Sequence, residues 1–297
     1  MPPLHAPKPE RRLTSIWFVL LVLTWGSVAV AASFEQDLAY GSDPLQRLDL
    51  ALPDAKGFPT VIFLHGGSLT SGDKADEDYR NVPAPFPVAG IACANVNYRL
   101  APAHDWPAQA EDVAAAVAWV REHIASRGGD PGKLYLMGHS SGATLAALVG
   151  SDARWLARHD LATSALQGVI PMGSIMWDVE LEQALEKYGR ERVEQAFGRD
   201  PDNKMYENLD AYLEHWPIRH IRGGMPPFLF LIAASEQEQP PVLATNRKFV
   251  EEARAKGNRA EYKVLPDRTH YSAIRRLGEP GDPAFALVRD FVHSASK

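Results

Sequence analysis

The chain has 297 residues, which is long enough for one catalytic α/β domain with an insertion. Its 45% hydrophobic and 23% charged residues are globular proportions and exclude a disordered, collagen-like or coiled-coil chain. The net charge of −6 argues against nucleic acid as a partner, and the single cysteine, Cys93, excludes an internal disulfide and any cysteine-based metal or redox motif.

Residues 1–31 have the features of a signal peptide. Three basic residues precede an apolar run: Lys8, Arg11 and Arg12. That run, Ile16–Val30, is shorter than the ~20 apolar residues that a spanning helix needs, and the small residues at its end favour cleavage after Ala31 or Ala32. The alternative is an uncleaved N-terminal anchor. In either case we expect an exported catalytic domain (residues 33–297), secreted or periplasmic, with no stable membrane insertion once the signal is removed.

After residue 33, short apolar runs alternate with longer helical patterns, which predicts an α/β fold with a mostly parallel sheet. The first run, Leu45–Leu52, alternates apolar and polar residues as an antiparallel entry strand would. The runs that suit buried strands are Thr60–Leu64, Ile91–Val96, Lys133–Met137, Phe228–Ala233 and Ala260–Leu265.

Apolar residues at helical spacing predict helices between these strands. They cover Ala108–Ile124, Ala143–Val149, Leu243–Ala255 and Ala284–His293. Residues 174–224 differ from their flanks because they are charged and rich in Trp and Tyr, with one helical pattern over Leu181–Phe197. We interpret them as an insertion between two strands, either a lid over the substrate pocket or a segment that merely packs on the domain.

The segment Gly138-His139-Ser140-Ser141-Gly142 is the only G-x-S-x-G match in the chain. An apolar strand precedes it and a helix of small residues follows it, as in a nucleophile elbow. This context makes Ser140 the candidate nucleophile. Upstream, the strand ending at Leu64 runs into His65-Gly66-Gly67-Ser68, a glycine-containing loop where the backbone itself can approach a substrate. His65 is expected to hold this loop by hydrogen bonds.

With these motifs the chain resembles the α/β-hydrolase esterases related to hormone-sensitive lipase and their carbohydrate-esterase and kynurenine-formamidase-type relatives. The further segments that carry the likeness are Asn97-Tyr98-Arg99-Leu100-Ala101-Pro102, Trp106-Pro107 and Glu111-Asp112-Val113. The resemblance implies an α/β-hydrolase fold with helices on both sheet faces and a small helical lid. It also implies an oxyanion hole formed by the N–H groups of Gly67, Ser68 and Ser141, although many relatives carry a third glycine where this chain has Ser68.

In this fold the catalytic acid and the histidine follow the serine in the chain. Only two histidines lie beyond the last predicted strand, and His293 falls within a predicted helix. His270, in a loop after that strand, is therefore the expected base. Relatives usually carry Asp three or four residues after the strand that here ends at Ala233, but this chain has glutamates there. Glu238 is the first candidate acid and Glu236 the second, and Asp267 is expected to be a turn residue.

These residues predict a serine hydrolase that cleaves carboxylic esters through an acyl-enzyme, acting on small-molecule or carbohydrate-linked esters, including acetylated or feruloylated ones. Two other interpretations stay open: an arylformamidase or other amide hydrolase, and a non-catalytic binding protein with the hydrolase fold. The five-residue spacing of His215 and His220 is poor for two ligands on one helix face, so we expect no metal. No nucleotide-binding glycine motif occurs, and we expect no cofactor.

Overall fold

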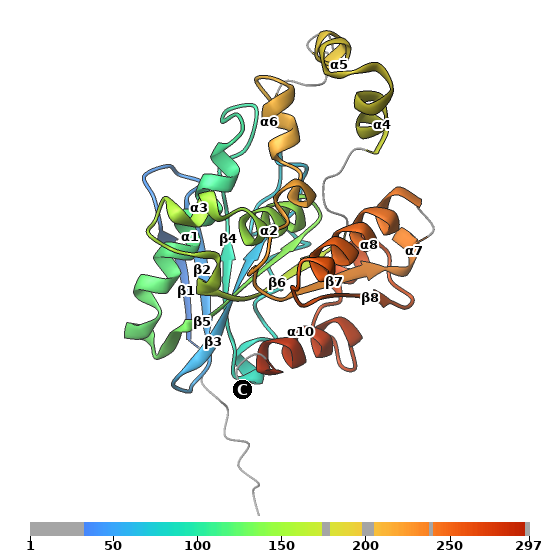
Figure 1. Cartoon of the computed structure of the whole chain (residues 1–297). Helices are drawn as coiled ribbons and strands as arrows, with labels where there is room; N and C mark the ends of the chain where they lie inside the picture. The colour runs from blue at the N-terminus through green and yellow to red at the C-terminus, as the bar shows by residue number, and fades with distance from the viewer. Residues whose placement is uncertain (1–32, 174–178, 198–204, 238–239, 295–297) are drawn as a thin grey trace, which may run out of the picture.

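The computed structural model describes residues 33–173, 179–197, 205–237 and 240–294. Within them, eight strands form one sheet in the order β1-β2-β4-β3-β5-β6-β7-β8 (Figure 1). β1 and β2 pair antiparallel with their neighbours, whereas the strands from β4 across to β8 are all parallel. The strands are β1 Ser33–Ala39, β2 Arg47–Leu52, β3 Phe58–Leu64, β4 Ala92–Val96, β5 Gly129–His139, β6 Leu166–Met172, β7 Phe228–Ala233 and β8 Ala260–Leu265.

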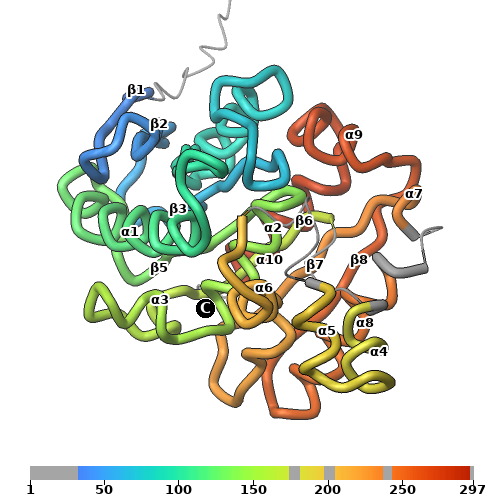
Figure 2. The backbone as a smooth tube through the Cα atoms, turned by 90° about the horizontal axis from the view of Figure 1, so that it is seen from above, coloured from blue at the N-terminus to red at the C-terminus, as the bar shows by residue number. Residues whose placement is uncertain are grey.

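Helices cover both faces of this sheet. Seen from above, α3 and α8 lie on one side, and α9 lies on the other with the segment that follows β3 (Figure 2). The α-helices are α1 Ala108–His123, α2 Ser141–Ser151, α3 Ala153–Ala157, α4 Val179–Tyr188, α5 Arg190–Phe197, α6 Leu209–Glu214, α7 Ala234–Gln237, α8 Pro240–Ala255, α9 His270–Arg275 and α10 Pro283–Ser294. The short 3₁₀ helices are Pro87–Ala89, Ala125–Arg127, Thr163–Ala165 and Pro217–His220.

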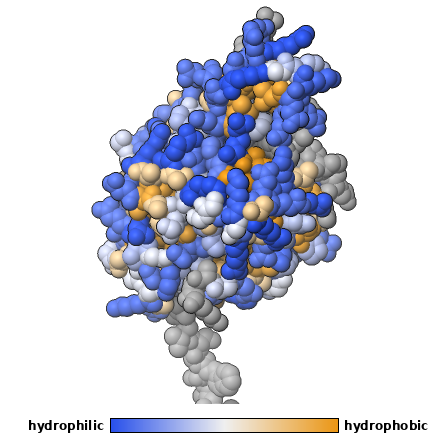
Figure 3. Space-filling model, viewed as in Figure 1, coloured by the Kyte–Doolittle hydropathy of each residue, from blue (hydrophilic) through white to orange (hydrophobic). Residues whose placement is uncertain are grey.

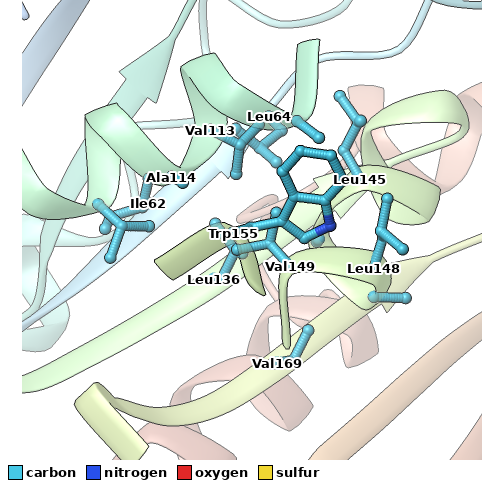
Figure 4. Close-up of a cluster of buried hydrophobic side chains, with 14 of the residues drawn as sticks. Ile62, Leu64, Val113, Ala114, Leu136, Leu145, Leu148, Val149, Trp155 and Val169 are labelled. Atoms are coloured by element: carbon cyan, nitrogen blue, oxygen red, sulfur yellow. The ribbon is translucent and has the colours of Figure 1, made fainter. Parts of the chain in front are cut away.

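The alternation of side chains along a strand divides the core into two layers. Ile62 and Leu64 of β3 belong to a cluster that includes residues of α1, α2 and α8, whereas Val61 and Phe63 belong to a second cluster with α9 and α10. Figure 4 shows Ile62 and Leu64 in the first layer, with Trp155 of α3 among their neighbours. Because these strands are buried on both faces, they read as continuous apolar runs in the sequence, which is why their positions could be predicted.

The sequence prediction missed two strands and joined two helices into one. β7 and β8 have their predicted bounds, but β1 and β6 were not predicted. The single helical pattern over Leu181–Phe197 was wrong in its continuity, since Gly189 adopts φ 79° and separates α4 from α5. Glycine takes this left-handed conformation without steric penalty, so it ends the first helix.

The carboxyl ends of the parallel strands lie at one edge of the sheet, which is where ligands bind in open α/β folds. Between β6 and β7 the chain forms α4, α5 and α6, which stand above this edge in Figure 1. The space-filling view shows apolar surface just below this topmost segment, on an otherwise mostly hydrophilic face (Figure 3). The predicted signal peptide lies outside the described residues. Among the helices that are described, none combines the length and the apolar character needed to cross a bilayer.

Candidate active site

The strand–turn–helix predicted around Ser140 is present. β5 ends at His139, α2 begins at Ser141, and Ser140 between them has φ 55° and ψ −124°. A non-glycine residue in this conformation stores roughly 1–3 kcal/mol of backbone strain, which is common at functional sites. The strained turn is held by the Ser140 N–H, which donates to the Met172 carbonyl of β6 at 3.0 Å.

Close backbone packing explains both glycines of the elbow motif. A Cβ on Gly138 would stand 2.1 Å from the Gly142 carbonyl oxygen, and a Cβ on Gly142 would stand 2.4 Å from the carbonyl oxygens of Leu64 and His65. Neither position can hold a larger residue unless the backbone moves. The same contacts press the start of α2 against the end of β3, where the second motif begins.

The His65-Gly66-Gly67-Ser68 loop packs directly against the nucleophile. A Cβ placed on Gly66 would lie 2.8 Å from the Ser140 Cβ. Beyond it the backbone turns sharply, with φ 123° at Gly67, 54° at Ser68 and 62° at Leu69. The Gly67 carbonyl closes this turn by accepting the N–H groups of Thr70 and Ser71, at 3.1 and 3.0 Å.

The three predicted oxyanion-hole donors lie on either side of Ser140. Ser141 is its chain neighbour, and Gly67 and Ser68 are in the loop that touches it. Within the described part of the chain, the structure gives none of these three N–H groups a hydrogen-bond acceptor. Unused backbone donors beside a nucleophile are what a developing oxyanion requires.

His65 holds this loop from within. The ring is buried and stacks on Tyr98, with centroids 4.4 Å apart, and its Nδ1 contacts the Gly66 carbonyl at 2.7 Å. Burial lowers the pKa of His65, so the neutral ring donates its Nδ1–H to that carbonyl. The Tyr98 hydroxyl in turn donates to the His65 carbonyl at 2.8 Å, which fixes the loop on both sides.

The expected base, His270, contacts the second candidate acid. His270 Nδ1 lies 2.6 Å from Glu236 Oε1, and the other carboxylate oxygen accepts the Ala233 N–H at 2.8 Å. Glu236 is 4% exposed, whereas a third of the His270 side chain is accessible. Because a carboxylate only accepts, His270 donates from Nδ1 and keeps the Nε2 lone pair available as a base.

The sequence favoured Glu238 over Glu236, and Glu238 lies outside the described residues. Glu236 is in α7, which begins directly after β7. Its segment is attached to the loop of the base, since the Ser235 N–H donates to the Arg268 carbonyl at 3.2 Å. Asp267 has φ 54° and is a turn residue.

Gly173 connects the acid–base pair to the nucleophile. A Cβ on Gly173 would lie 3.3 Å from Glu236 Oε1 and 3.5 Å from His270 Cε1. Its chain neighbour Met172 is the residue whose carbonyl holds the Ser140 N–H. One dipeptide at the end of β6 therefore touches both the elbow and the Glu236–His270 pair.

His270 was expected in a loop, and this was wrong: it is the first residue of the short helix α9. Thr269 caps this helix, since its side chain accepts the Ser272 N–H while the Ser272 hydroxyl accepts the Thr269 N–H. Such a reciprocal cap satisfies two orphan donors and fixes where the helix begins. The cap thus fixes the main chain of His270.

Two side chains with no predicted role also touch the site. His139, the last residue of β5, is fully buried and its Nε2 lies 2.9 Å from the His270 carbonyl oxygen. Its Nδ1 lies 3.1 Å from the Tyr79 hydroxyl. The motif contained His139 without assigning it a function, and no sequence pattern indicated Tyr79, which is 60 residues away.

The remaining histidine predictions concern metal and packing. His293 contacts the Ala89 carbonyl at 3.2 Å, far from the elbow in the fold. His215 is buried against Trp106, and His220 contacts the Glu214 carbonyl. The parts of the chain that the structure describes contain no group of three His, Cys, Asp or Glu side chains arranged to hold a metal ion.

Comparisons with known proteins identify a family and several similar chains. Residues 48–243 match the model of the BD-FAE family. The chain is 29% identical over 246 residues to the probable carboxylic ester hydrolase LipM of Mycobacterium tuberculosis, covering 79% of this chain and 55% of the relative. It is 30% identical over 265 residues to the esterase LipC of the same organism, covering 84% and 62%. The chain therefore spans less than two thirds of the length of these curated relatives.

Solved structures share the fold. A truncated carbohydrate esterase from gut microbiota superposes with a TM-score of 0.67 at 19% identity, covering 89% of this chain and 96% of that one. Esterase 2 of Thermogutta terrifontis gives a TM-score of 0.65 at 22% identity, covering 89% and 92%. The predicted α/β-hydrolase fold is confirmed. The kynurenine-formamidase part of the resemblance stays a prediction.

Proposed function

Because the chain belongs to the BD-FAE family, we propose that it is a serine carboxylesterase that works through an acyl-enzyme on Ser140. The observation that carries this proposal is the short contact between His270 and the buried Glu236, at the same sheet edge as a strained serine elbow. A base oriented by a buried carboxylate, beside a serine and unused backbone donors, is the constellation of acyl transfer.

The reaction would proceed in two halves. Ser140 Oγ attacks the ester carbonyl carbon while His270 Nε2 takes the hydroxyl proton, and the carbonyl electron pair moves onto oxygen. The N–H groups of Gly67, Ser68 and Ser141 would stabilise that oxyanion. Collapse breaks the ester C–O bond, and His270 returns its proton to the departing alcohol. Water then repeats the sequence on the acyl-enzyme and releases the carboxylic acid.

We assign the orienting acid to Glu236. Each of its oxygens has one donor, His270 Nδ1–H on one side and the Ala233 N–H on the other. Both oxygens accept a hydrogen bond, and together the two bonds fix the orientation of the carboxylate towards His270. The glutamate side chain reaches His270 from α7, three residues after the end of β7.

The ester class is proposed as small-molecule or carbohydrate-linked, including acetylated or feruloylated esters. Support comes from the neighbouring structure named a carbohydrate esterase and from Tyr271, which is 52% exposed with its ring 5.2 Å from that of His270. An exposed aromatic ring beside the base is a surface on which a sugar or phenolic group can lie. Rates on acetylated xylan, methyl ferulate, p-nitrophenyl acetate and N-formylkynurenine would separate this class from an amide hydrolase. Equally negligible rates on all four would favour a binding protein.

The decisive experiment is the Ser140→Ala variant. We expect a folded protein with kcat lowered by about 10⁶, the loss seen when a catalytic serine is removed elsewhere. A fluorophosphonate should label the wild type once per chain and leave Ser140→Ala unlabelled. Ser126→Ala is a matched control, because Ser126 is exposed and bonds only to the His123 carbonyl in the described structure. Retention of more than a few per cent of activity in Ser140→Ala would reject the nucleophile.

A further inference from the structure

Tyr79 and His139 connect three parts of the site that are far apart in the sequence. His139 Nε2 contacts the carbonyl of the base, His270, and His139 Nδ1 contacts the Tyr79 hydroxyl. The Tyr79 hydroxyl also packs against Gly66, in the loop that carries the oxyanion donors, since a Cβ on Gly66 would stand 2.7 Å from the hydroxyl oxygen. His139 itself directly precedes the nucleophile.

The His270 carbonyl fixes the direction of each hydrogen bond in this series. A carbonyl oxygen only accepts, so His139 must donate to His270 from Nε2. Burial, together with the nearby His270 ring, lowers the pKa of His139 to about 4, so near neutral pH the ring has a single proton. His139 Nδ1 therefore accepts, and the Tyr79 O–H must donate to it.

Tyr79 extends this series of contacts to the oxyanion loop. Burial raises the pKa of Tyr79 to about 12, so the hydroxyl stays protonated and donates a hydrogen bond to His139. A Cβ on Gly66 would stand 2.7 Å from the hydroxyl oxygen, so Tyr79 packs directly on the Gly66 backbone. The contacts run from Gly66 through Tyr79 and His139 to the His270 carbonyl.

We propose that Tyr79 and His139 are a positioning pair that sets the base His270 in register with the nucleophile Ser140 and with the oxyanion loop. The inference rests on the proposed ester hydrolysis, because only there is His270 a base. The pair touches no substrate atom in this scheme. It acts by fixing two main-chain segments, the start of α9 and Gly66, against the end of β5.

A second tyrosine–histidine pair in the molecule provides the comparison. Tyr206 and His215 are buried and hydrogen-bonded hydroxyl to Nδ1, and burial lowers the pKa of His215 to about 3. This pair packs on Trp106, and in the described part of the chain it makes no hydrogen bond or ring contact with Ser140, His270 or Glu236. If a buried Tyr–His pair matters only for packing, the two pairs should respond alike to substitution.

The test compares the two pairs in the full-length protein. His139→Leu removes both hydrogen bonds of the His139 ring, Tyr79→Phe removes only the one from the hydroxyl, and His139→Gln keeps an amide N–H as a donor for the His270 carbonyl. His215→Leu and Tyr206→Phe are the matched controls. The readouts are kcat/KM on p-nitrophenyl acetate and on ethyl acetate, the melting temperature, and the downfield NMR resonance of the His270 Nδ1 proton, assigned by its loss in His270→Gln.

We expect His139→Leu to lower kcat/KM by about 10- to 100-fold, since a misplacement of about 1 Å can cost 10²-fold. The loss should be greater on ethyl acetate, because its alkoxide needs a proton from a well-placed His270, whereas p-nitrophenolate leaves without one. The downfield resonance should shift or broaden, and His139→Gln should recover most of the rate. The control variants should lose melting temperature but keep the resonance and the ratio of the two rates.

The inference is overturned if His139→Leu behaves like His215→Leu, with a lowered melting temperature, an unmoved resonance and kcat/KM within threefold of wild type. If His139→Leu does not fold, Tyr79→Phe and His139→Gln decide by the same readouts. The resonance is measured without substrate, so it tests the positioning even if Ser140→Ala were to retain activity and the proposed function failed.

Discussion

Replacing Glu236 by glutamine tests the acid at the level of single hydrogen bonds. The carboxylate accepts from His270 Nδ1 at 2.6 Å with one oxygen and from the Ala233 N–H at 2.8 Å with the other. An amide has one oxygen and one NH₂ group, so it cannot accept both bonds. If its oxygen stays on Ala233, the NH₂ faces His270 and forces the proton to Nε2, where it blocks the attack of Ser140.

The size of the activity loss in Glu236→Gln depends on which of the two hydrogen bonds the amide gives up. In a serine protease, the equivalent loss of the correct tautomer lowers kcat about 10⁴-fold. If the amide turns the other way, His270 keeps its acceptor and Ala233 loses its partner, which costs about 1–3 kcal/mol of stability because the site is buried. We expect a mixture of the two amide orientations. It should lower kcat/KM on p-nitrophenyl acetate by about 10² to 10⁴ and also lower the melting temperature.

Glu238→Gln is the matched control, since it makes the same chemical change two residues away. Its activity should stay within a few-fold of wild type. The downfield His270 resonance should disappear in Glu236→Gln and persist in Glu238→Gln. The reverse ranking of the two activities would return the acid to Glu238. Near-wild-type activity in both variants would refute the assignment and make Asp267 the next candidate.

Three further predictions concern the N-terminus, stability and the elbow. N-terminal sequencing of the protein from its native host should begin at Ala32 or Ser33, and a chain beginning at Met1 in a membrane fraction would indicate an anchor instead. Burial lowers the pKa of His139 to about 4 and that of His215 to about 3, below the value near 6.5 in the unfolded chain. The free energy of unfolding should therefore be highest above pH 6.5 and fall as the pH is lowered towards 4. For His139 this amounts to about 3 kcal/mol, and chemical denaturation at pH 7 and pH 4.5 should show a smaller difference in His215→Leu than in wild type. Gly142→Ala should lose well over 1 kcal/mol and most activity, because its Cβ would stand 2.4 Å from two carbonyl oxygens; a near-wild-type variant would mean that the elbow yields easily.

The sequence was most informative where a residue's role depends on its neighbours in the chain. The Ser140 elbow, for example, is set by one strand, two glycines and one helix, all within about 20 residues. β7 was predicted because a strand buried on both faces is apolar throughout. β1 was missed for the opposite reason: it is an edge strand with mostly exposed residues, so no apolar pattern marks it.

The choice between the two glutamates depended on contacts that the sequence does not reveal. Glu236 and Glu238 have the same chemistry and are two residues apart. Glu236 contacts His270 because α7 begins directly at the end of β7, and because Ser235 is attached to Arg268 across 33 residues. Counted from the end of β7 at Ala233, Glu236 is three residues away and Glu238 five, so the usual spacing of three or four residues fits the glutamate that contacts His270.

The same reasoning explains why His139 had no predicted role. The motif leaves its second position open, since the turn itself requires only the glycines and the serine. In this chain, the partners of that position are the Tyr79 hydroxyl, 60 residues before it, and the His270 carbonyl, 131 residues after it. Neither partner carries a local signal, because a loop tyrosine and a main-chain oxygen occur everywhere. A buried neutral histidine is costly unless both nitrogens are satisfied, and the fold meets that requirement only by bringing the oxyanion loop, the elbow and the base together.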